Sequence, residues 1–169
     1  MEGGILDDMT DAIASSDIKD NFSDTLVNNY VRDGKNYAVP KDFDTNALWY
    51  NKDLFDQAGV EYPTDDMTYD DLVALATELK DKLPDGVYPF ACPVDFQTWY
   101  YQTVYANGGW ILNDDATETG YGDAKTQEGI QCWIDMIDAG LSPSASTLSE
   151  TGSDAMFEGE QIAMTLAGS

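Results

Sequence analysis

Two segments of the chain carry hydrophobic residues at helical spacing. The first follows Thr68 and Asp71, whose three-residue separation is typical of a capping box at a helix start. Its apolar face consists of Leu72, Leu75, Ala76, Leu79 and Leu83. The apolar stripe of the second consists of Ile130, Trp133, Ile134 and Ile137. We therefore expect two amphipathic helices, one from about Leu72 and one from about Ile130 onward. Their apolar faces should build the core.

Short apolar runs between these segments predict strands. Such runs occupy residues 47–50, 87–91 and 162–166. Further helices are expected at residues 5–16, 52–58, 97–106 and 153–157. Asp33-Gly34 predicts a tight turn in a small hairpin over residues 31–39, and Gly59 predicts a left-handed helix cap. Strands that alternate with helices indicate an α/β fold.

Composition restricts the partners. The 169-residue chain is long enough for one core, and its 32 Asp and Glu against 8 Lys and Arg give a net charge of −24. This charge disfavours nucleic acid and anionic lipid. We interpret the acidity as a solvated surface, with a dedicated cationic partner as the alternative. The sequence contains neither an apolar run of membrane-spanning length nor a basic and apolar leader at Met1.

The sequence lacks the residues that several kinds of functional site require. The chain has no His, which excludes Ser-His-Asp and Cys-His nucleophilic sites and most zinc sites. The sequence contains neither the P-loop motif G-x-x-x-x-G-K-[ST] nor the dinucleotide-binding motif G-x-G-x-x-G. Residues 113–123 supply oxygen donors but lack the glycine and glutamate positions of a calcium loop. Cys92 and Cys132 are interpreted as two buried thiols rather than a disulfide. We expect no cofactor and no metal.

Sugar binding requires aromatic faces and hydroxyl acceptors, and both are present. Asp42 and Asp44 are two apart in an extended segment and so point to one side. The densest aromatic patch consists of Phe96, Trp99, Tyr100, Tyr101 and Tyr105. At least two of these rings should pack in the core. Trp110, after a glycine pair, either lies exposed in a loop or covers the helix end.

A series of motifs resembles one known family. They are GKNYAVP at residues 34–40, DT at 44–45, LWYNKDLF at 48–55, AG at 58–59, MTYDDL at 67–72, NGG at 107–109, IDAG at 137–140 and AMFEGEQIAM at 155–164. In this order they resemble the extracellular solute-binding proteins, family 1, of sugar-transporting ABC systems, the group that includes maltose-binding protein. One departure is Tyr69, where the family usually has Trp.

The resemblance implies a type II periplasmic-binding-protein fold, of which this chain would be mainly the second lobe. Residues 1–43 would be the tail of the first lobe with the crossover. Residues 44–169 would be the second α/β lobe, incomplete. Such proteins are usually longer and have two lobes, so this chain resembles a middle piece.

The implied function is capture of an extracellular sugar or oligosaccharide and its delivery to an ABC transporter permease. The resemblance implies a monomer at the extracellular face or in the periplasm, with a lipid anchor as one option, and no enzyme. Two alternatives stay open: a glycoside hydrolase that uses an Asp/Glu pair, and a non-catalytic acidic interaction domain. No sequence pattern marks a hydrolase pair.

The resemblance also supplies candidate ligand-binding residues. Asp44 matches a family position that often carries an acidic ligand residue, and Trp99 matches an aromatic near the cleft. Asp42, Phe96 and Trp110 complete the expected ligand-binding set. The structural alternatives are a turn-capping role for Asp44 and core packing for the rings.

Overall fold

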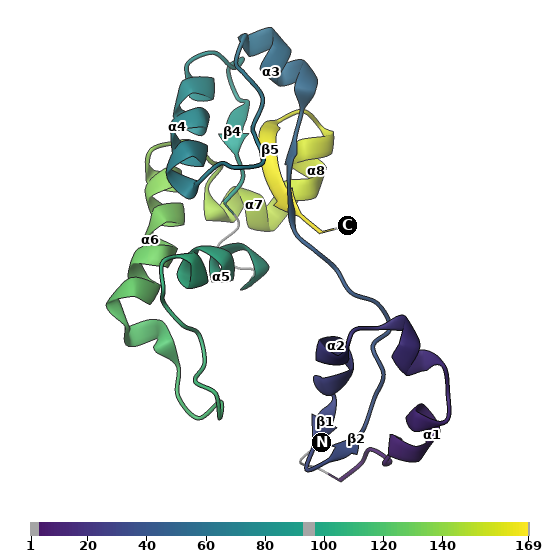
Figure 1. Cartoon of the computed structure of the whole chain (residues 1–169). Coiled ribbons are helices and arrows are strands. Elements are labelled where there is room, and N and C mark those ends of the chain that lie inside the picture. The colour runs from purple at the N-terminus through teal and green to yellow at the C-terminus, as the bar shows by residue number, and fades with distance from the viewer. Residues whose placement is uncertain (1–3, 93–96, 169) are drawn as a thin grey trace. The chain divides into compact units, whose positions relative to one another are not determined.

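A computed structural model describes residues 4–92 and 97–168 (Figure 1). The chain divides into two compact units, Met1–Thr45 and Asn46–Ser169. Each unit is described by itself. The assignment of residues 1–43 and 44–169 to two lobes stays a prediction.

The first unit contains three short helices and a hairpin. Its elements are α1 (Thr10–Ala14), η1 (Ile18–Asn21), α2 (Asp24–Asn28), β1 (Val31–Arg32) and β2 (Lys35–Asn36). Strands β1 and β2 are antiparallel, and Asp33 and Gly34 between them have φ angles of 52° and 75°. Positive φ at both turn positions is why an Asp-Gly pair is favoured there, and the hairpin prediction is confirmed. The helix expected at residues 5–16 is shorter, and η1 and α2 were not predicted.

The second unit contains a three-stranded sheet in the order β3-β5-β4. Its strands are β3 (Ala47–Tyr50), β4 (Tyr88–Phe90) and β5 (Ile162–Ala167). Strand β5 lies in the middle, antiparallel to β3 and parallel to β4. Residues 162–165 of β5 are buried, as expected of a central strand covered on both faces. All three strands predicted from apolar runs are present.

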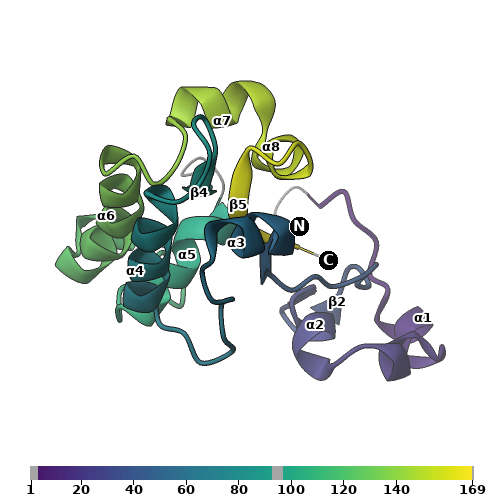
Figure 2. The same ribbon diagram turned by 90° about the horizontal axis from the view of Figure 1, so that it is seen from above.

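Helices cover both faces of this sheet. They are α3 (Lys52–Ala58), α4 (Tyr69–Lys80), α5 (Gln97–Ala106), η2 (Gly120–Gly122), α6 (Ala124–Asp138), α7 (Ala145–Thr151) and α8 (Ser153–Glu158). Figures 1 and 2 show α4 and α6 on one side of β4 and β5, and α7 and α8 on the other. This layering is the α/β arrangement that the sequence predicts. Helix α7 was not predicted.

The predicted helix caps are confirmed. The Thr68 hydroxyl accepts a hydrogen bond from the Asp71 backbone N–H at 3.2 Å, and an Asp71 carboxylate oxygen accepts one from the Thr68 N–H at 2.9 Å. This reciprocal pair satisfies two N–H groups that a helix start leaves without partners. At the end of α3, Gly59 has φ 63°, a left-handed conformation that glycine adopts without steric cost.

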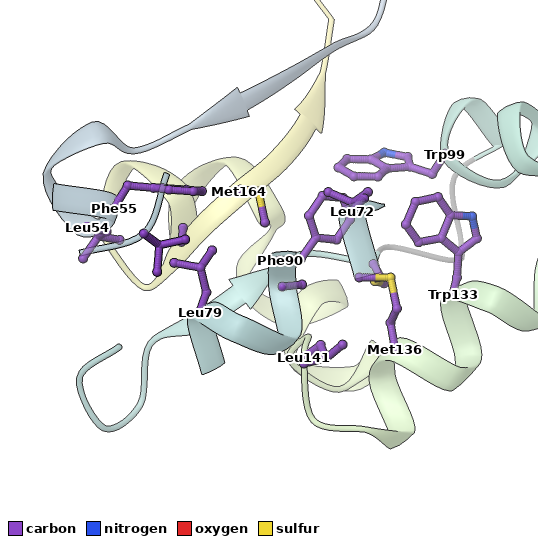
Figure 3. Packing of buried hydrophobic residues seen from close by; sticks show 14 residues of the cluster. Leu54, Phe55, Leu72, Leu79, Phe90, Trp99, Trp133, Met136, Leu141 and Met164 are labelled. Carbon is purple, nitrogen blue, oxygen red and sulfur yellow. The ribbon is translucent and has the colours of Figure 1, made fainter. Parts of the chain in front are cut away.

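The main core lies between the sheet and helices α3, α4 and α6, and Figure 3 shows its packing. Phe90 and Trp133 are stacked with ring centroids 5.7 Å apart and an interplanar angle of 9°. The Trp133 indole N–H donates to the Thr103 hydroxyl at 2.9 Å, so this buried donor has a partner. A smaller cluster on the α7 and α8 side contains Ala91, Leu148, Met156 and Ile162.

One core prediction for α6 is wrong. Ile134 is 38% exposed, and Ile130 is only partly buried. The buried residues of α6 are Thr126, Gly129, Trp133 and Met136. Gly129 faces α5 at a separation that only a residue without a side chain allows, because a Cβ there would lie 2.7 Å from the Val104 Cα. The predicted core positions Leu72, Leu79 and Trp133 are buried, and Leu75 and Ile137 pack against them.

Both cysteines are free thiols. Cys92 is buried and Cys132 is partly buried. Burial raises the pKa of the Cys92 thiol to about 12, and it also raises the pKa of the Cys132 thiol. Neither thiol is therefore ionised at neutral pH, and they act as the small apolar side chains that the sequence indicates.

Candidate functional site

Helix α5 lies beyond the carboxyl ends of the parallel strands β4 and β5 (Figure 1). Strand β4 ends at Phe90, and α5 begins at Gln97. In open α/β sheets, ligands bind outside the carboxyl ends of the strands. The site therefore begins with the side chains that α5 presents.

Four tyrosines gather on α5 and η2, and we call them the tyrosine cluster: Tyr100, Tyr101, Tyr105 and Tyr121. The rings of Tyr100 and Tyr101 are 5.0 Å apart, and those of Tyr101 and Tyr105 are 6.3 Å apart, each pair at 87°. The hydroxyl oxygens of Tyr100 and Tyr121 are 3.0 Å apart and share a hydrogen bond. Tyr105 is 56% exposed and Tyr121 is 42% exposed. The cluster is thus a connected aromatic surface open to solvent.

The phenol hydroxyls of the cluster influence one another. The hydrogen bond with Tyr100 raises the pKa of Tyr121. The pKa of Tyr101 is also raised, mainly by desolvation of its hydroxyl and secondly by a hydrogen bond with Tyr121. Both hydroxyls therefore stay protonated at neutral pH. A protonated phenol both donates and accepts hydrogen bonds, so the cluster offers both functions to a ligand.

The loop between α5 and α6 positions Tyr121. The Thr126 hydroxyl donates to the Trp110 carbonyl oxygen and accepts from the Trp110 N–H, both at 3.0 Å. A Cβ on Gly120 would lie 2.0 Å from that carbonyl oxygen, so only glycine permits this approach. These contacts fix the loop against the start of α6 and hold η2 beside α5.

The candidate carboxylates lie in the first unit. Asp42 and Asp44 are exposed in extended chain. A carboxylate oxygen of Asp42 lies 3.2 Å from the Lys41 ammonium nitrogen. An oxygen of Asp44 accepts from the Thr45 N–H at 2.8 Å, which is a contact with the next residue in extended chain and not a contact across a turn. The ligand roles of both residues stay predictions.

The candidate aromatic residues lie in the second unit. Trp99 is 8% exposed and contacts Phe90 edge to face at a centroid separation of 6.5 Å. Its ring belongs to the core cluster (Figure 3), as the core-packing alternative requires. Trp110 is partly buried. Phe96 lies outside the described residues. The ligand roles of these three rings stay predictions.

Tyr121 is the site residue that sequence reasoning missed. It lies in a segment that the sequence predicts only as a polar loop. The sequence offers a signal for Tyr100, Tyr101 and Tyr105 but not for Tyr121: residues 96–113 contain no Asp, Glu, Lys or Arg in a chain with 24% charged residues. An uncharged aromatic stretch in so acidic a protein marks a surface used for something other than solubility.

A hollow of about 230 Å³ lies between α4, α5 and α6, and its chemistry differs from that of the tyrosine cluster. The carboxylates of Asp70 and Glu128 line it, together with Tyr69, Thr103 and Cys132. The Asn107 amide donates to Glu128 at 3.2 Å and to the Lys125 carbonyl oxygen at 2.9 Å. This hollow is acidic, whereas the tyrosine cluster is uncharged.

The described part of the chain has neither a cluster of metal-ligating side chains nor a membrane-spanning helix. No group of three or more Cys, Asp or Glu side chains among these residues is arranged to hold a metal ion. Within residues 4–92 and 97–168, none of the helices combines the length and apolar character needed to cross a bilayer.

Comparison with known proteins gives consistent matches. A putative binding protein of Brucella abortus is 29% identical over 160 residues, which are 92% of this chain and 38% of that protein. The ABC substrate-binding protein Lmo0181 from Listeria monocytogenes, solved in complex with cycloalternan, is 33% identical with a TM-score of 0.86. The match covers 99% of this chain and 43% of the Listeria protein.

A third match is the GacH receptor of Streptomyces glaucescens, solved unliganded and with acarbose. It is 26% identical with a TM-score of 0.79, over 99% of this chain and 42% of the receptor. The chain thus spans about two fifths of the length of these relatives. The expected type II periplasmic-binding-protein fold is confirmed, for part of that fold. Since the bacterial extracellular solute-binding protein family matches residues 1–169, the whole chain, this protein belongs to that family.

Proposed function

We propose that this protein is the carbohydrate-binding component of an ABC importer, which captures an extracellular sugar or oligosaccharide and delivers it to the permease. The observation that carries the proposal is the 33% identity and TM-score of 0.86 to a substrate-binding protein solved in complex with cycloalternan. A second solved relative holds acarbose.

The surface chemistry of the chain supports a carbohydrate. Pyranose rings have an apolar face that packs on aromatic rings and hydroxyls that need acceptors and donors. The tyrosine cluster supplies exposed rings and protonated phenols. In the proposed site, the exposed carboxylates of Asp42 and Asp44 accept hydrogen bonds from sugar hydroxyls, and Phe96, Trp99 or Trp110 contribute ring surface.

The proposed mechanism is binding without bond cleavage. The ligand contacts both lobes and so favours their closed arrangement, which the permease recognises. We propose that the protein is not an enzyme, acts as a monomer, and works at the extracellular face or in the periplasm, where a lipid anchor would keep it near the permease.

The test is a binding screen on the complete protein. Thermal shift and calorimetry are run against monosaccharides and oligosaccharides of glucose, galactose, xylose and arabinose. At least one of them should bind saturably. Asp44→Ala should weaken its binding by about 1–3 kcal/mol, as expected for a lost hydrogen bond to a charged group, and leave the melting temperature nearly unchanged because Asp44 is exposed.

The screen also separates the alternatives. Release of reducing sugar that disappears on mutation of one Asp or Glu would overturn the binding-only mechanism. A protein that binds no saccharide in the panel would contradict the proposed function and favour the acidic interaction domain.

A further inference from the structure

We propose that the groove between α4 and α6 is a docking surface for a basic amphipathic helix of a partner protein. The two helices lie side by side (Figures 1 and 2), and we call the depression between them the α4–α6 groove. The residues that define it are Asp70, Val73, Glu128, Cys132, Asp135 and Met136. None of the candidate ligand-binding residues lines this groove, so the inference goes beyond the proposed sugar site.

Two adjoining hollows form the groove. One is the hollow of about 230 Å³ described above, the other has a volume of about 400 Å³, and Asp70 and Cys132 line both. Along α6 the lining extends from Glu128 to Ala139. This stretch is about three turns, or about 16 Å, long. A depression of that length accommodates several side chains of one helix.

The floor of the groove is largely apolar. Val73 of α4 and Cys132 of α6 are partly buried, and Met136 is 2% exposed. The Cys132 thiol donates to the Gly129 carbonyl oxygen at 3.2 Å, and burial raises its pKa, so it carries no charge at neutral pH. Apolar side chains of a partner that pack on this floor lose contact with water, which favours binding.

Carboxylates lie on both sides of the groove. Asp70 belongs to α4, Glu128 and Asp135 belong to α6, and all three residues are exposed. The side-chain amide of Asn107 donates to Glu128 at 3.2 Å, and that of Gln131 donates to Asp135 at 2.8 Å, and both donors are neutral. In the part of the chain that the structure describes, none of these carboxylates forms an ion pair, and no Lys or Arg lines either hollow. The groove therefore complements a positively charged partner.

The spacing of the carboxylates suits a helix. Glu128 and Asp135 are seven residues apart on α6, which places them about 10.5 Å apart along its axis. Two Lys or Arg residues seven apart in a partner helix have the same separation, and apolar residues three and four positions after the first lie on the same face. Such a helix pairs both charges while its apolar residues cover Val73 and Met136. This is the helix-in-groove mode of recognition.

A second copy of this chain does not supply such a helix. The chain has 8 Lys and Arg residues, and no two of them are seven positions apart. The net charge of −24 also makes two copies repel each other. The matching occupant is therefore a segment of a different protein that carries the opposite charge.

The test is binding of a designed peptide to the complete protein. The probe is a fluorescein-labelled, alanine-rich peptide of about 18 residues, long enough to form a helix. It has two lysines seven positions apart and leucines three and four positions after the first lysine. The comparison peptide has the same composition, but its lysines are five positions apart and so lie on different faces.

Fluorescence anisotropy gives the dissociation constants for the wild type, Asp135→Lys and Asp138→Lys. Asp138→Lys is the matched control, because Asp138 is also an exposed aspartate of α6 but lines neither hollow. Both substitutions change the net charge of the protein equally. Only the first places a lysine in the groove.

We expect the wild type to bind the matched peptide about tenfold more tightly than the comparison peptide, with an affinity that falls as salt is raised. Asp135→Lys should weaken binding about tenfold, because it places like charges opposite each other, and Asp138→Lys should weaken it about twofold at most. Replacing one of the two peptide lysines by glutamate should restore binding to Asp135→Lys. A purely structural role of Asp135 does not predict this rescue.

Equal weakening by Asp135→Lys and Asp138→Lys would show general attraction to the acidic surface and would overturn the inference. It would also be overturned if the wild type bound both peptides equally or bound neither, as when another part of the longer protein covers the groove. Sugar binding by Asp135→Lys should equal that of the wild type, because Asp135 lies outside the proposed sugar site. The inference and the proposed function therefore fail on different measurements.

Discussion

Gly129 of α6 lies directly against the backbone of Val104 in α5. A Cβ on Gly129 would be 2.7 Å from the Val104 Cα and 2.9 Å from the Thr103 carbonyl oxygen. Real Cβ atoms do not approach backbone atoms this closely. The two helices therefore pack at a separation that only glycine allows, and the register of α6 against α5 depends on this position.

Gly129→Ala should destabilise the protein. The added methyl group forces α5 and α6 apart, and overpacking of this kind costs about 1–3 kcal/mol. Chemical denaturation measures the loss. Gly122→Ala is the matched control, because a Cβ there meets no atom within 4 Å, and its effect should stay within about 0.5 kcal/mol. Equal stability of the two variants would contradict the close approach.

Trp99→Ala should destabilise more than Trp49→Ala. Trp99 is 8% exposed in the core, and replacing a buried Trp by Ala costs about 3–5 kcal/mol. Trp49 is 49% exposed, and its indole N–H donates to the Ala167 carbonyl oxygen at 3.3 Å. Thermal and denaturant unfolding of both variants measures the difference. If Trp99→Ala lost sugar affinity at unaltered stability, the ring would be a ligand contact and not a core residue.

Tyr62 should titrate at unusually high pH. The hydrogen bond to the Asp56 carboxylate raises the Tyr62 pKa from 10.0 to about 12, because ionisation would place two negative charges together. A raised folded-state pKa contributes stability that is complete below pH 10 and is lost as the pH rises toward 12. Subtracting the ultraviolet absorbance titration curve of Tyr62→Phe from that of the wild type isolates the Tyr62 hydroxyl. The difference curve should have its midpoint near 12.

Asp56→Asn supplies the control for that titration. Without the carboxylate charge, the Tyr62 difference curve should shift down toward 10. A wild-type midpoint already near 10 would show that the hydroxyl does not bond Asp56 in solution.

Salt should stabilise the fold. The net charge is −24, and the described residues form three ion pairs, Asp8 with Lys35, Asp42 with Lys41, and Glu78 with Lys82. Repulsion among the remaining carboxylates opposes the compact state, and salt screens it. Raising sodium chloride from about 0.05 to about 0.5 M should raise the melting temperature, by about 2–4 °C for each 1 kcal/mol gained. A melting temperature that falls over this range would show that ion pairs dominate over repulsion.

Local signals in the sequence determined the strands of the second unit, the hairpin turn and the caps of α3 and α4. The apolar run at residues 47–50 coincides with β3, and the Thr68 to Asp71 spacing forms the capping box of α4. The Asp33-Gly34 pair forms its turn, and the motifs from residue 34 onward indicate the family to which the chain belongs. These features depend on residues near one another in the chain, where steric and hydrogen-bonding rules act directly.

Only the tertiary structure decided which face of α6 is buried and which side chains distant in the sequence meet. The sequence favoured Ile134 for the core because it shares a helical stripe with Trp133, but close packing of α5 on α6 buries Gly129 and leaves Ile134 38% exposed. The contact between Tyr100 and Tyr121 likewise depends on the path of the loop that Thr126 and Gly120 fix. Burial and long-range contact depend on what packs opposite a residue, and a linear pattern does not contain the partner.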